Sequence, residues 1–377
     1  MIIAVNTRLL LKDRLEGIGW FSYESLKRIT SNHKEHEFVF IFDRPYDESF
    51  IFSDNIRPVV IYPQARHPLL YYMWFEYSIP FILKKHKAGL FFSPDGYLSL
   101  SSEVKQVNVF HDLNFEYYPA DLPPAERYFY RHYFPLYARK AKRIATVSEY
   151  SKQDIAQLYH IDPCNIDVVY NGVNEKYMPV SDAVKVQTRN DYTGGCEYFV
   201  FVGALHPRKN IRNLFLAFDR FRETTDSNIK LLVVGEKKWW TSAIEEAYEN
   251  MKYKCEVIFA GRLSPEKLNS VVGSALALTY ISYFEGFGIP MVEAFSTGTP
   301  VITSNVTCLP EIAGDAALHT DPFSIDSIAD AMKQIAFDPE LREQLISKGN
   351  IRKTLYSWDK TAEKLWNCIE KAMEQGT

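Results

Sequence analysis

The chain has 377 residues, of which 46% are hydrophobic and 24% charged, an ordinary composition for a globular protein. A chain of this length exceeds the size at which a single hydrophobic core stops growing, so two domains are expected. The formal net charge of −4 gives no basic surface for a general nucleic-acid-binding protein, and no nucleic-acid partner is expected.

The cysteines and the apolar segments indicate a reducing, cytoplasmic location. Five scattered cysteines without a Cys-x-x-Cys pair predict neither a zinc site nor a disulfide scaffold. Met1–Leu11 lacks the cleavage segment of a signal peptide. The most lipid-like run, Leu69–Leu83, is too short to span a bilayer and contains Glu76 and Pro80, so we expect a buried or interfacial helix there. A peripheral position at the inner face of the membrane stays open.

The first half of the chain begins with a strand and a glycine-containing turn. Met1–Val5 is a predicted strand, and after a polar segment Gly17-Ile18-Gly19 opens a helix at Trp20–Thr30. A Gly-x-Gly between a strand and a helix can bring the backbone close to a phosphate, but it can also be a plain tight turn. Further strands are predicted at Phe38–Asp43, Val59–Tyr62, Gly89–Ser93, Lys105–Phe110, Arg143–Val147 and Ile166–Tyr170, and a helix at Ser151–Tyr159.

One of these strands ends at a histidine. His111-Asp112 directly follows Lys105–Phe110, and the carboxyl end of a parallel strand is where α/β folds place functional groups. His111 is therefore a candidate site residue, although an isolated histidine there is more often structural. Asp112 is expected to orient the loop or to cap the next segment.

A basic, aromatic segment follows. A helix predicted at Ala125–Lys142 carries six aromatic residues, and in the stretch 125–143 basic residues greatly outnumber the single acid, Glu126. Such a helix can lie on an anionic membrane surface or bind a lipid-phosphate acceptor, which makes peripheral membrane contact through 125–143 one interpretation. The other is that Pro135 interrupts the helix and that its aromatic residues form core.

The second half restarts after an irregular stretch. Residues 176–197 collect Pro, Ser, Asp and Gly-Gly, and we interpret them as a linker between domains. A clean alternation of strands and helices follows, which predicts a parallel sheet in each half. The strands are expected at Tyr198–Val202, Lys230–Val234, Glu256–Ala260, Leu276–Ser282 and Pro300–Thr303, and the helices at Asn210–Thr224, Ser242–Lys252, Ser264–Ser274, Ile325–Phe337, Pro339–Ile351 and about Trp358–Gln375.

The most informative stretch is 282–304. A strand leads into a glycine-rich turn, Glu285-Gly286-Phe287-Gly288, and Pro290–Thr297 is a short predicted helix ended by Gly298. Free N–H groups of Gly286, Phe287 and Gly288 beside a helix N-terminus can bind anionic or hydroxyl-rich ligands. Glu293, expected in the first turn of that helix, can accept hydrogen bonds from both hydroxyls of a ribose; equally, it can merely favour the helix dipole.

A second candidate group is Arg208-Lys209, which follows the first strand of the second half beyond Gly203. A guanidinium and an ammonium held together can neutralise a diphosphate and gain strength as a departing nucleoside diphosphate collects negative charge. The chain contains no Asp-x-Asp pair that would hold a divalent cation for this purpose. We therefore expect no metal ion and no other cofactor.

These motifs resemble retaining glycosyltransferases of family 4. The resemblance rests on Glu285, seven intervening residues and Glu293, with Gly-Phe-Gly-x-Pro after the first glutamate and Gly-x-Pro-Val-Ile after the second. Further family-like segments occur in the right order along nearly the whole chain. They are His111-Asp112, Val147-Ser148, Asn171-Gly172-Val173, Gly203 with Pro207-Arg208-Lys209-Asn210, Val234-Gly235, Gly261-Arg262-Leu263, Leu309-Pro310-Glu311 and Ser357-Trp358.

The resemblance implies the GT-B architecture, an α/β fold of two Rossmann-like domains with parallel sheets that face each other across a cleft. It places the acceptor-side domain at 1–175, joined by a C-terminal helix at 358–377, and the nucleotide-sugar domain at 198–357. The roles that it implies fall into two groups. The catalytic group is His111, Arg208, Lys209 and Glu285, and the donor-binding group is Gly17, Gly19, Gly203, Arg262, Leu263, Gly286, Phe287, Gly288 and Glu293.

The expected activity is transfer of a hexose, with mannose favoured by the general habits of the family, from a GDP- or UDP-linked sugar to a glycan or lipid-linked glycan acceptor. The anomeric configuration would be retained, and no metal ion would be needed. The family also suggests surface polysaccharide or lipopolysaccharide synthesis. Two alternatives stay open: a nucleotide-sugar epimerase or hydrolase on the same fold, and a catalytically idle subunit that binds a nucleotide sugar.

Overall fold

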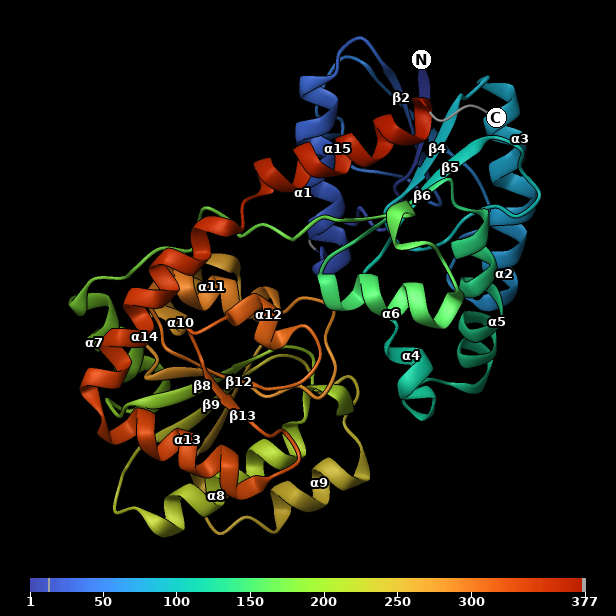
Figure 1. Ribbon diagram of the computed structural model, residues 1–377. Helices are drawn as coiled ribbons and strands as arrows, with labels where there is room; N and C mark the ends of the chain where they lie inside the picture. The colour runs from blue at the N-terminus through green and yellow to red at the C-terminus, as the bar shows by residue number, and fades with distance from the viewer. Residues whose placement is uncertain (13, 375–377) are drawn as a thin grey trace. The chain divides into compact units, whose positions relative to one another are not determined.

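The chain divides into two compact units in the computed structural model, which describes residues 1–12 and 14–374 (Figure 1). Unit 1 comprises Met1–Gly172 together with the C-terminal segment from Trp358, and unit 2 comprises Val173–Ser357. Gln375–Thr377, the end of the domain predicted at 358–377, lie outside the described residues. The units are therefore divided at positions 172 and 357.

Unit 1 is built on a seven-stranded parallel sheet with the order β3-β2-β1-β4-β5-β6-β7. The direction of the strand order changes between β1 and β4, which pair with Val5 opposite Phe92. The strands are β1 (Ile2–Asn6), β2 (Glu37–Phe42), β3 (Ile56–Val60), β4 (Leu90–Ser93), β5 (Lys105–Phe110), β6 (Arg143–Thr146) and β7 (Ile166–Val168). The helices are α1 (Gly17–Asn32), η1 (Glu48–Phe50), α2 (Pro68–Met73), the π-helix η2 (Trp74–Ser78), α3 (Ile79–Lys85), α4 (Asn114–Tyr117), η3 (Pro119–Asp121), α5 (Pro124–Lys140), α6 (Glu149–Tyr159), η4 (Pro163–Asn165) and α15 (Trp358–Glu374).

Unit 2 holds a six-stranded parallel sheet with the order β10-β9-β8-β11-β12-β13. Its strands are β8 (Tyr198–Val202), β9 (Lys230–Val234), β10 (Val257–Gly261), β11 (Ala277–Tyr280), β12 (Val301–Ser304) and β13 (Leu318–Thr320). Its helices are α7 (Asp182–Thr193), η5 (Pro207–Lys209), α8 (Ile211–Thr224), α9 (Ser242–Glu249), η6 (Lys254–Glu256), α10 (Pro265–Gly273), α11 (Ile289–Thr297), α12 (Leu309–Ala313), α13 (Ile325–Phe337), α14 (Pro339–Arg352) and η7 (Lys353–Leu355).

Each unit has its own hydrophobic core, formed where apolar strands meet amphipathic helices. In unit 2, α8 places Leu214, Phe215 and Phe218 against buried strand residues such as Phe199 and Leu231. Strands that are buried on both faces read as continuous apolar runs, as β8 (Tyr-Phe-Val-Phe-Val) does. These two parallel α/β sheets confirm the predicted fold class.

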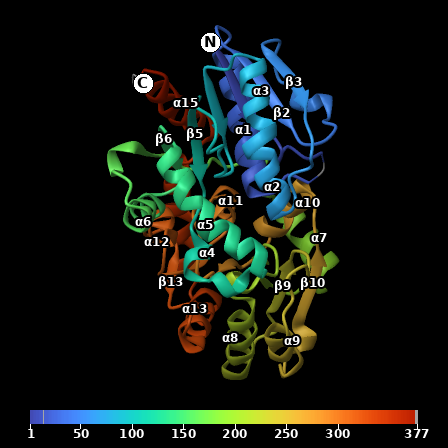
Figure 2. The ribbon, with the colours of Figure 1, turned by 90° about the vertical axis from the view of Figure 1, so that its right-hand side faces the viewer.

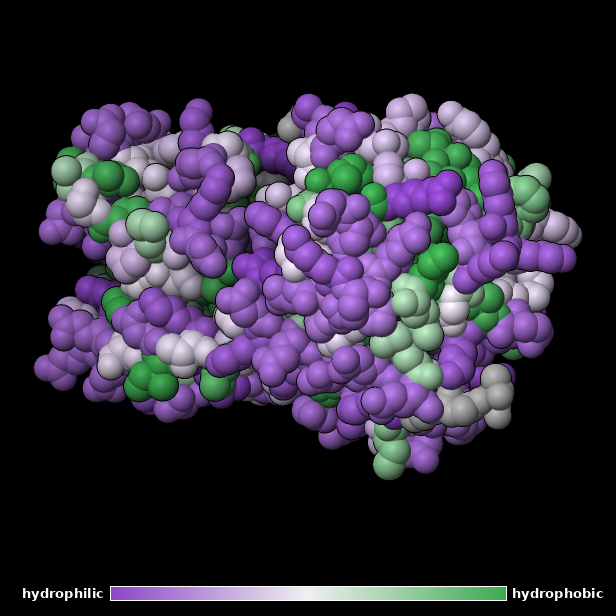
Figure 3. Space-filling model, turned by 90° about the horizontal axis from the view of Figure 1, so that it is seen from above, coloured by the Kyte–Doolittle hydropathy of each residue, from purple (hydrophilic) through white to green (hydrophobic). Residues whose placement is uncertain are grey.

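Helices cover the outside of unit 1, and Figure 2 shows α3 and α5 on the side that faces the viewer. Hydrophilic residues occupy most of the surface seen in Figure 3, and apolar residues gather there in smaller patches. Among residues 1–12 and 14–374, no helix combines the length and the hydropathy needed to cross a membrane.

Two local expectations differ from the structure, and a third, the helix expected at 69–83, is present with a local irregularity. The stretch 176–197, expected as a linker, contains α7, which Ser181 caps and which belongs to unit 2. Pro135 does not interrupt α5, which runs through it. The segment 69–83 forms one continuous helical path in which a π-turn precedes Pro80. Proline cannot donate the usual backbone hydrogen bond, so a locally widened turn accommodates it.

Candidate active site

The predicted catalytic residues of unit 2 meet at the carboxyl ends of two neighbouring strands. Arg208 and Lys209 follow β8, and Glu285 follows β11. β8 and β11 pair directly, and the strand order of the sheet changes direction between them. In open α/β sheets this is the point where two loops diverge and ligands bind.

The arginine and the lysine are held by a short helical turn. His206 precedes η5, and its Nδ1 accepts a hydrogen bond from the Arg208 N–H at 3.2 Å. Asn210 follows with a φ of +59°, and its side-chain amide donates to the Ile281 and Pro322 carbonyls at 3.1 and 2.7 Å. Asn210 therefore ties the β8 loop to the β11 loop, which fixes the positions of the two cations.

Glu285 lies between the two cations and pairs with both. Its Oε2 is 2.8 Å from Arg208 Nη1, and its Oε1 is 2.5 Å from Lys209 Nζ. Lys209 Nζ also donates to the Tyr280 hydroxyl at 2.9 Å, and Arg208 Nη1 donates to the Phe284 carbonyl at 3.2 Å. The cluster carries one net positive charge beside the glycine-rich turn.

The electrostatics of the cluster keep Glu285 ionised. The residue is only 5% exposed, and burial alone would raise the pKa of its carboxyl, but Arg208 and Lys209 outweigh burial and lower that pKa to about 2. Burial and the neighbouring carboxylate raise the pKa of Tyr280 far above its ordinary value, so its hydroxyl stays protonated. A carboxylate that is paired with two cations at neutral pH cannot act as a general acid.

The glycine-rich turn depends on the absence of side chains. Gly288 has a φ of +97°, and a Cβ there would lie 2.8 Å from Met291 Cε. Gly203 and Gly235 show a related constraint at the ends of β8 and β9, because a Cβ on Gly235 would lie 1.9 Å from the Gly203 carbonyl oxygen. The conformation of the turn at Gly288 and the close approach of these two strand ends both require glycine.

Glu293 lies on α11, but not where it was expected. The helix begins at Ile289, one residue earlier than predicted, so Glu293 is past the first turn and does not lie at the positive end of the helix. Burial raises the pKa of its carboxyl to about 7, and a hydrogen bond with the Tyr177 hydroxyl partly opposes this rise. Glu293 is thus near half-protonation at neutral pH, which leaves it able to accept or donate a hydrogen bond.

Two further donor-binding candidates of unit 2, Arg262 and Leu263, lie on the turn after β10. Gly261 has a φ of +66°, and its carbonyl accepts a hydrogen bond from the Gly235 N–H at 2.9 Å. Leu263 is half-buried and Arg262 is exposed. The turn therefore lies at the same edge of the sheet as the loops after β8 and β9, but the structure shows no contact between Arg262 or Leu263 and Glu285 among the described hydrogen bonds and ion pairs.

The predicted site residues of unit 1 form a separate group. His111 follows β5, its Nε2 lies 2.8 Å from the Pro94 carbonyl oxygen, and its ring packs edge-on against Phe21 of α1 at 5.0 Å. Gly17 and Gly19 lie in the first turn of the same helix. Burial lowers the pKa of His111, so the ring is neutral at pH 7, and the contact with a carbonyl requires the proton on Nε2.

The aromatic residues of α5 mostly serve the core of unit 1. Phe129, Phe134 and Tyr137 are buried in that core, and Tyr130 and Tyr133 pack against it. Of the six, Tyr128 is the one that is largely exposed, at 69%. Core packing thus accounts for most of the pattern that suggested membrane contact through 125–143, and that contact stays a prediction.

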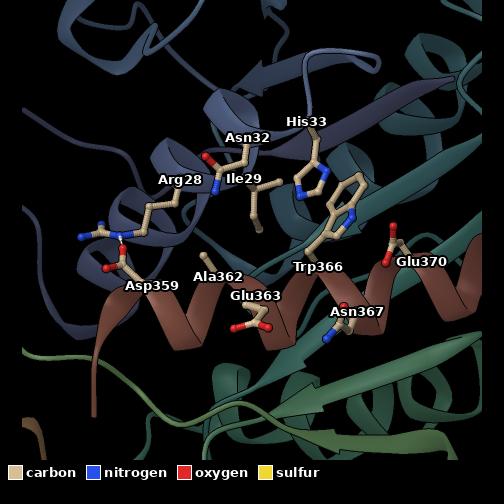
Figure 4. Close-up of a pocket in the computed structure, with 10 residues that line it drawn as sticks. All are labelled: Arg28, Ile29, Asn32, His33, Asp359, Ala362, Glu363, Trp366, Asn367 and Glu370. Atoms are coloured by element: carbon tan, nitrogen blue, oxygen red, sulfur yellow. Dashed lines mark hydrogen bonds and ion pairs between the residues drawn. The ribbon is translucent and has the colours of Figure 1, made fainter. Parts of the chain in front are cut away.

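A groove of about 460 Å³ lies between α1 and α15 in unit 1 (Figure 4). Arg28 Nε reaches Asp359 at 2.5 Å at one end, and His33 stacks on Trp366 with a centroid separation of 3.7 Å. These contacts attach the C-terminal helix to unit 1. The groove contains none of the predicted site residues, so it carries no assignment to the active site.

Two family models together cover most of the chain. The model described as glycosyltransferase family 4 matches residues 17–177, and the one described as glycosyl transferases group 1 matches residues 189–352. The chain belongs to glycosyltransferase family 4. It is therefore a glycosyltransferase enzyme with the GT-B fold, as the ordered motifs predicted.

Relatives of this glycosyltransferase agree with the assignment. O-antigen chain mannosyltransferase B of Escherichia coli is 28% identical over 376 residues, covering 96% of this chain and 97% of the relative. WaaG, a glycosyltransferase involved in lipopolysaccharide biosynthesis, superimposes with a TM-score of 0.73 at 16% identity, covering 97% of this chain and 98% of its own. Anabaena Alr3699/HepE, solved in complex with UDP-glucose, gives 0.76 at 14% identity, covering 98% and 100%. At these identities, the solved structures show the fold.

Several residues that position the candidate site of this glycosyltransferase belong to no motif in its sequence. Tyr280 and Tyr177 contact Lys209 and Glu293, and Cys308 donates its thiol hydrogen to the Glu285 carbonyl, with Sγ 3.1 Å from that oxygen. Tyr280 reads in the sequence as an ordinary apolar strand residue, so only its place beside Glu285 on the next loop could have marked it. Within the described parts of the chain, no cluster of three or more His, Cys, Asp or Glu residues could hold a metal ion.

Proposed function

We propose that this glycosyltransferase moves mannose from a nucleotide-diphosphate sugar to a glycan or lipid-linked glycan acceptor, with retention of configuration and without a metal ion. The observation that carries the proposal is the cluster of Arg208, Lys209 and Glu285 at the switch point of the unit 2 sheet. The chemistry of each of these groups matches one requirement of sugar transfer from a diphosphate.

The two cations supply the charge that the leaving group needs. As the bond between the sugar and the diphosphate breaks, negative charge grows on the phosphate oxygens. Arg208 and Lys209 are held in place by the loops after β8 and β11, so they stabilise that charge without first having to be ordered. Two fixed cations can thus take the part that a divalent cation plays in metal-dependent transferases.

Glu285 orients the cations and offers carboxylate oxygens to the sugar, but it does not attack the anomeric carbon. Both of its oxygens already pair with cations, Oε1 with Lys209 and Oε2 with Arg208. A carboxylate whose pKa lies at about 2 is a weak nucleophile and a weak base. This supports a mechanism without a covalent glycosyl-enzyme intermediate.

Retention then follows from attack on the face that the leaving group occupies. The acceptor hydroxyl oxygen forms a bond to the anomeric carbon on the side from which the diphosphate leaves. The departing phosphate oxygen takes the proton of that hydroxyl, so the products are the glycoside and the protonated nucleoside diphosphate. This route needs no other base on unit 2.

The choice of mannose and of a surface-glycan acceptor rests on the relatives. A relative that matches 96% of this chain is named an O-antigen chain mannosyltransferase, and a second, 28% identical over 70% of the chain, is named likewise. The carrier nucleotide is GDP or UDP, and Glu293 is the candidate ligand for its ribose hydroxyls.

A thermal-shift panel tests the donor site. Wild-type protein is heated with GDP-mannose, UDP-glucose, GDP or UDP, with and without EDTA. One nucleotide should stabilise unit 2 by about 2.7 kcal/mol at a hundredfold excess over its dissociation constant, regardless of EDTA. In Arg208→Gln/Lys209→Met/Glu285→Gln, which leaves no unpaired charge in the cluster, the shift should vanish while the unliganded protein stays folded by circular dichroism. Arg220→Ala/Lys252→Ala removes two exposed cations from the same unit and should keep the shift.

Turnover separates the proposal from its two competitors. The protein is incubated with the donor and a lipid-linked glycan extract, and NMR determines whether the new linkage is axial or equatorial. The product should have the same anomeric configuration as the donor. Rapid loss of donor without acceptor would favour an epimerase or hydrolase. Nucleotide binding without turnover under any acceptor would favour an idle binding subunit, and stabilisation that disappears with EDTA would contradict the metal-free mechanism.

A further inference from the structure

The helical path formed by α2, η2 and α3 is apolar on two opposite faces. Its inner face packs into the core of unit 1. The buried residues are Trp74, Phe75, Ile79, Ile82 and Leu83. A helix that covers the surface of a globular protein normally turns polar residues outward, and a helix that is apolar all round is normally buried all round. The path formed by α2, η2 and α3 fits neither description, because its outer face is apolar and exposed.

The outer face carries large apolar side chains at a spacing of four residues. Leu69, Met73, Tyr77 and Phe81 are 63%, 42%, 65% and 64% exposed. Residues four apart lie above one another on the same side of a helix, so these four form one stripe. Single exposed apolar residues are common, but a row of four large ones along one element calls for a function.

Two tyrosines widen the stripe into a patch. Tyr72 contacts the ring of Tyr77 at a centroid distance of 6.0 Å. Tyr62 is 64% exposed, and its carbonyl accepts a hydrogen bond from the Ser78 hydroxyl at 2.7 Å, which places it beside the same helix. We call Tyr62, Leu69, Tyr72, Met73, Tyr77 and Phe81 the aromatic face. In Figure 2, α3 runs along the side of unit 1 that faces the viewer.

The exposed charges on the segment that carries the aromatic face are basic. Between positions 62 and 87 the exposed charged residues are Arg66, Lys84, Lys85 and Lys87. The single acid of this stretch, Glu76, is half-buried, and its carboxylate accepts the Leu100 and Ser101 N–H groups at 2.8 and 2.9 Å. The exposed Glu103, two residues after Ser101, lies 3.9 Å from Lys140. Apolar rings bordered by cations, with the acid turned inward, complement an anionic surface that has an apolar interior.

We propose that the aromatic face docks this protein on a membrane that contains anionic lipids, with α2 and α3 lying in the plane of the headgroups. Tyr62, Tyr72 and Tyr77 suit the interface because a tyrosine ring has an apolar body and a polar end. Lys84 and Lys85 reach the phosphates while their stems extend over apolar surface. This surface adjoins 125–143, because Tyr72 packs on Tyr133 of α5 at a ring-centroid distance of 6.0 Å. The proposal does not depend on the proposed sugar or donor.

A second copy of the chain fits the same face less well. A two-fold contact places each patch against its own equivalent, which would bring Lys84 and Lys85 of one copy towards the basic residues of the other. Like charges facing each other across an interface oppose association. An anionic bilayer has the opposite charge and satisfies both parts of the patch.

Vesicle co-sedimentation tests the inference. The protein is mixed with vesicles of phosphatidylcholine alone or of phosphatidylcholine and phosphatidylglycerol, at low and high salt. We expect binding to the anionic vesicles, weakened by salt. Tyr77→Ser/Phe81→Ser should reduce the partition coefficient by about tenfold or more, since two exposed side chains no longer enter the interface. Lys84→Glu/Lys85→Glu should abolish the preference for phosphatidylglycerol.

The matched control removes two equally exposed apolar side chains from unit 2. Phe337 and Ile351 are 58% and 71% exposed, and Phe337→Ser/Ile351→Ser should bind vesicles as the wild type does. The proposal is overturned if wild type stays in the supernatant with anionic vesicles, or if the aromatic-face variant sediments like the control. It is also overturned if light scattering shows a dimer that Tyr77→Ser/Phe81→Ser dissociates, because a second copy would then occupy the face.

Discussion

Replacing Glu285 with glutamine should destabilise unit 2 by about 3 kcal/mol. The pKa of this carboxyl is about 2, against an ordinary value of 4.5, and each pKa unit corresponds to about 1.4 kcal/mol in favour of the ionised form. Glutamine keeps the shape but removes the charge, which leaves Arg208 and Lys209 side by side without a counter-ion. Loss of one partner from a buried ion pair costs roughly this much in other proteins.

Scanning calorimetry measures the effect. For a unit of this size, about 3 kcal/mol corresponds to a fall in Tm of roughly 6–12 °C. The stabilisation is present above pH 4.5 and is lost as the pH falls towards 2, because the folded-state pKa is depressed. The difference between wild type and Glu285→Gln should therefore be constant from pH 6 to 8 and shrink on acidification. A fall below about 2 °C at pH 7 would refute the reasoning.

The same variant separates binding from catalysis. Without Glu285, the cluster has two net positive charges where the wild type has one. Glu285→Gln should therefore bind the free nucleoside diphosphate at least as tightly as wild type, while sugar transfer falls by about a hundredfold or more. Isothermal titration measures the first quantity and steady-state kinetics the second. Parallel loss of both would show that Glu285 contributes to the site through folding alone.

Three further predictions concern single positions. Glu293→Gln should raise the free energy of unfolding by up to about 3 kcal/mol at pH 8 and by little at pH 4.5, because burial raises the pKa of Glu293 to about 7 and the cost of ionising it grows from pH 4.5 upwards. Thermal unfolding across this pH range measures the change, and equal changes at both pH values would contradict the prediction. His111→Gln should lessen the loss of stability below pH 6.5, since burial lowers the pKa of this ring and the unfolded chain binds the proton more tightly. Urea unfolding at a series of pH values measures this, and the same fall in unfolding free energy below pH 6.5 in variant and wild type would contradict it. Gly288→Ala should lower the free energy of unfolding by more than the roughly 1–2 kcal/mol expected for Gly194→Ala. Both glycines have a positive φ, but only a Cβ at position 288 would meet a neighbouring atom within 3 Å. Similar losses in Tm for the two variants would show that Met291 moves away easily.

The sequence predicted the fold well where the hydrophobic period was simple. β5, β8, β9 and α13 have the predicted bounds, because each is an apolar run or an amphipathic stretch between clear turn residues. The strand at Leu318–Thr320 was missed, since three residues between short turns leave no period to detect. The helix α7 was missed because Gly194-Gly195 and its polar composition suggested a linker, although Ser181 is a good N-cap.

The candidate site was predictable in its members and less so in its geometry. The motifs identified Arg208, Lys209 and Glu285 as candidates, but the strand order that makes β8 and β11 neighbours comes from the structure. That Glu285 would bind both cations could not be read from the sequence, because it depends on the paths of two loops that Asn210 ties together. The roles of these residues in catalysis stay predictions.

The C-terminal helix makes unit 1 discontinuous in the sequence. Trp366, Leu365 and Ile369 of α15 are buried, yet they are separated from the rest of unit 1 by the whole of unit 2. A ribosome therefore completes residues 173–357 while unit 1 still lacks one of its helices. The nascent chain leaves exposed the apolar surface that α15 will cover, between α1 and the strands β5 and β6, until α15 itself has been synthesised. Unit 2 can mature first, although unit 1 is begun first.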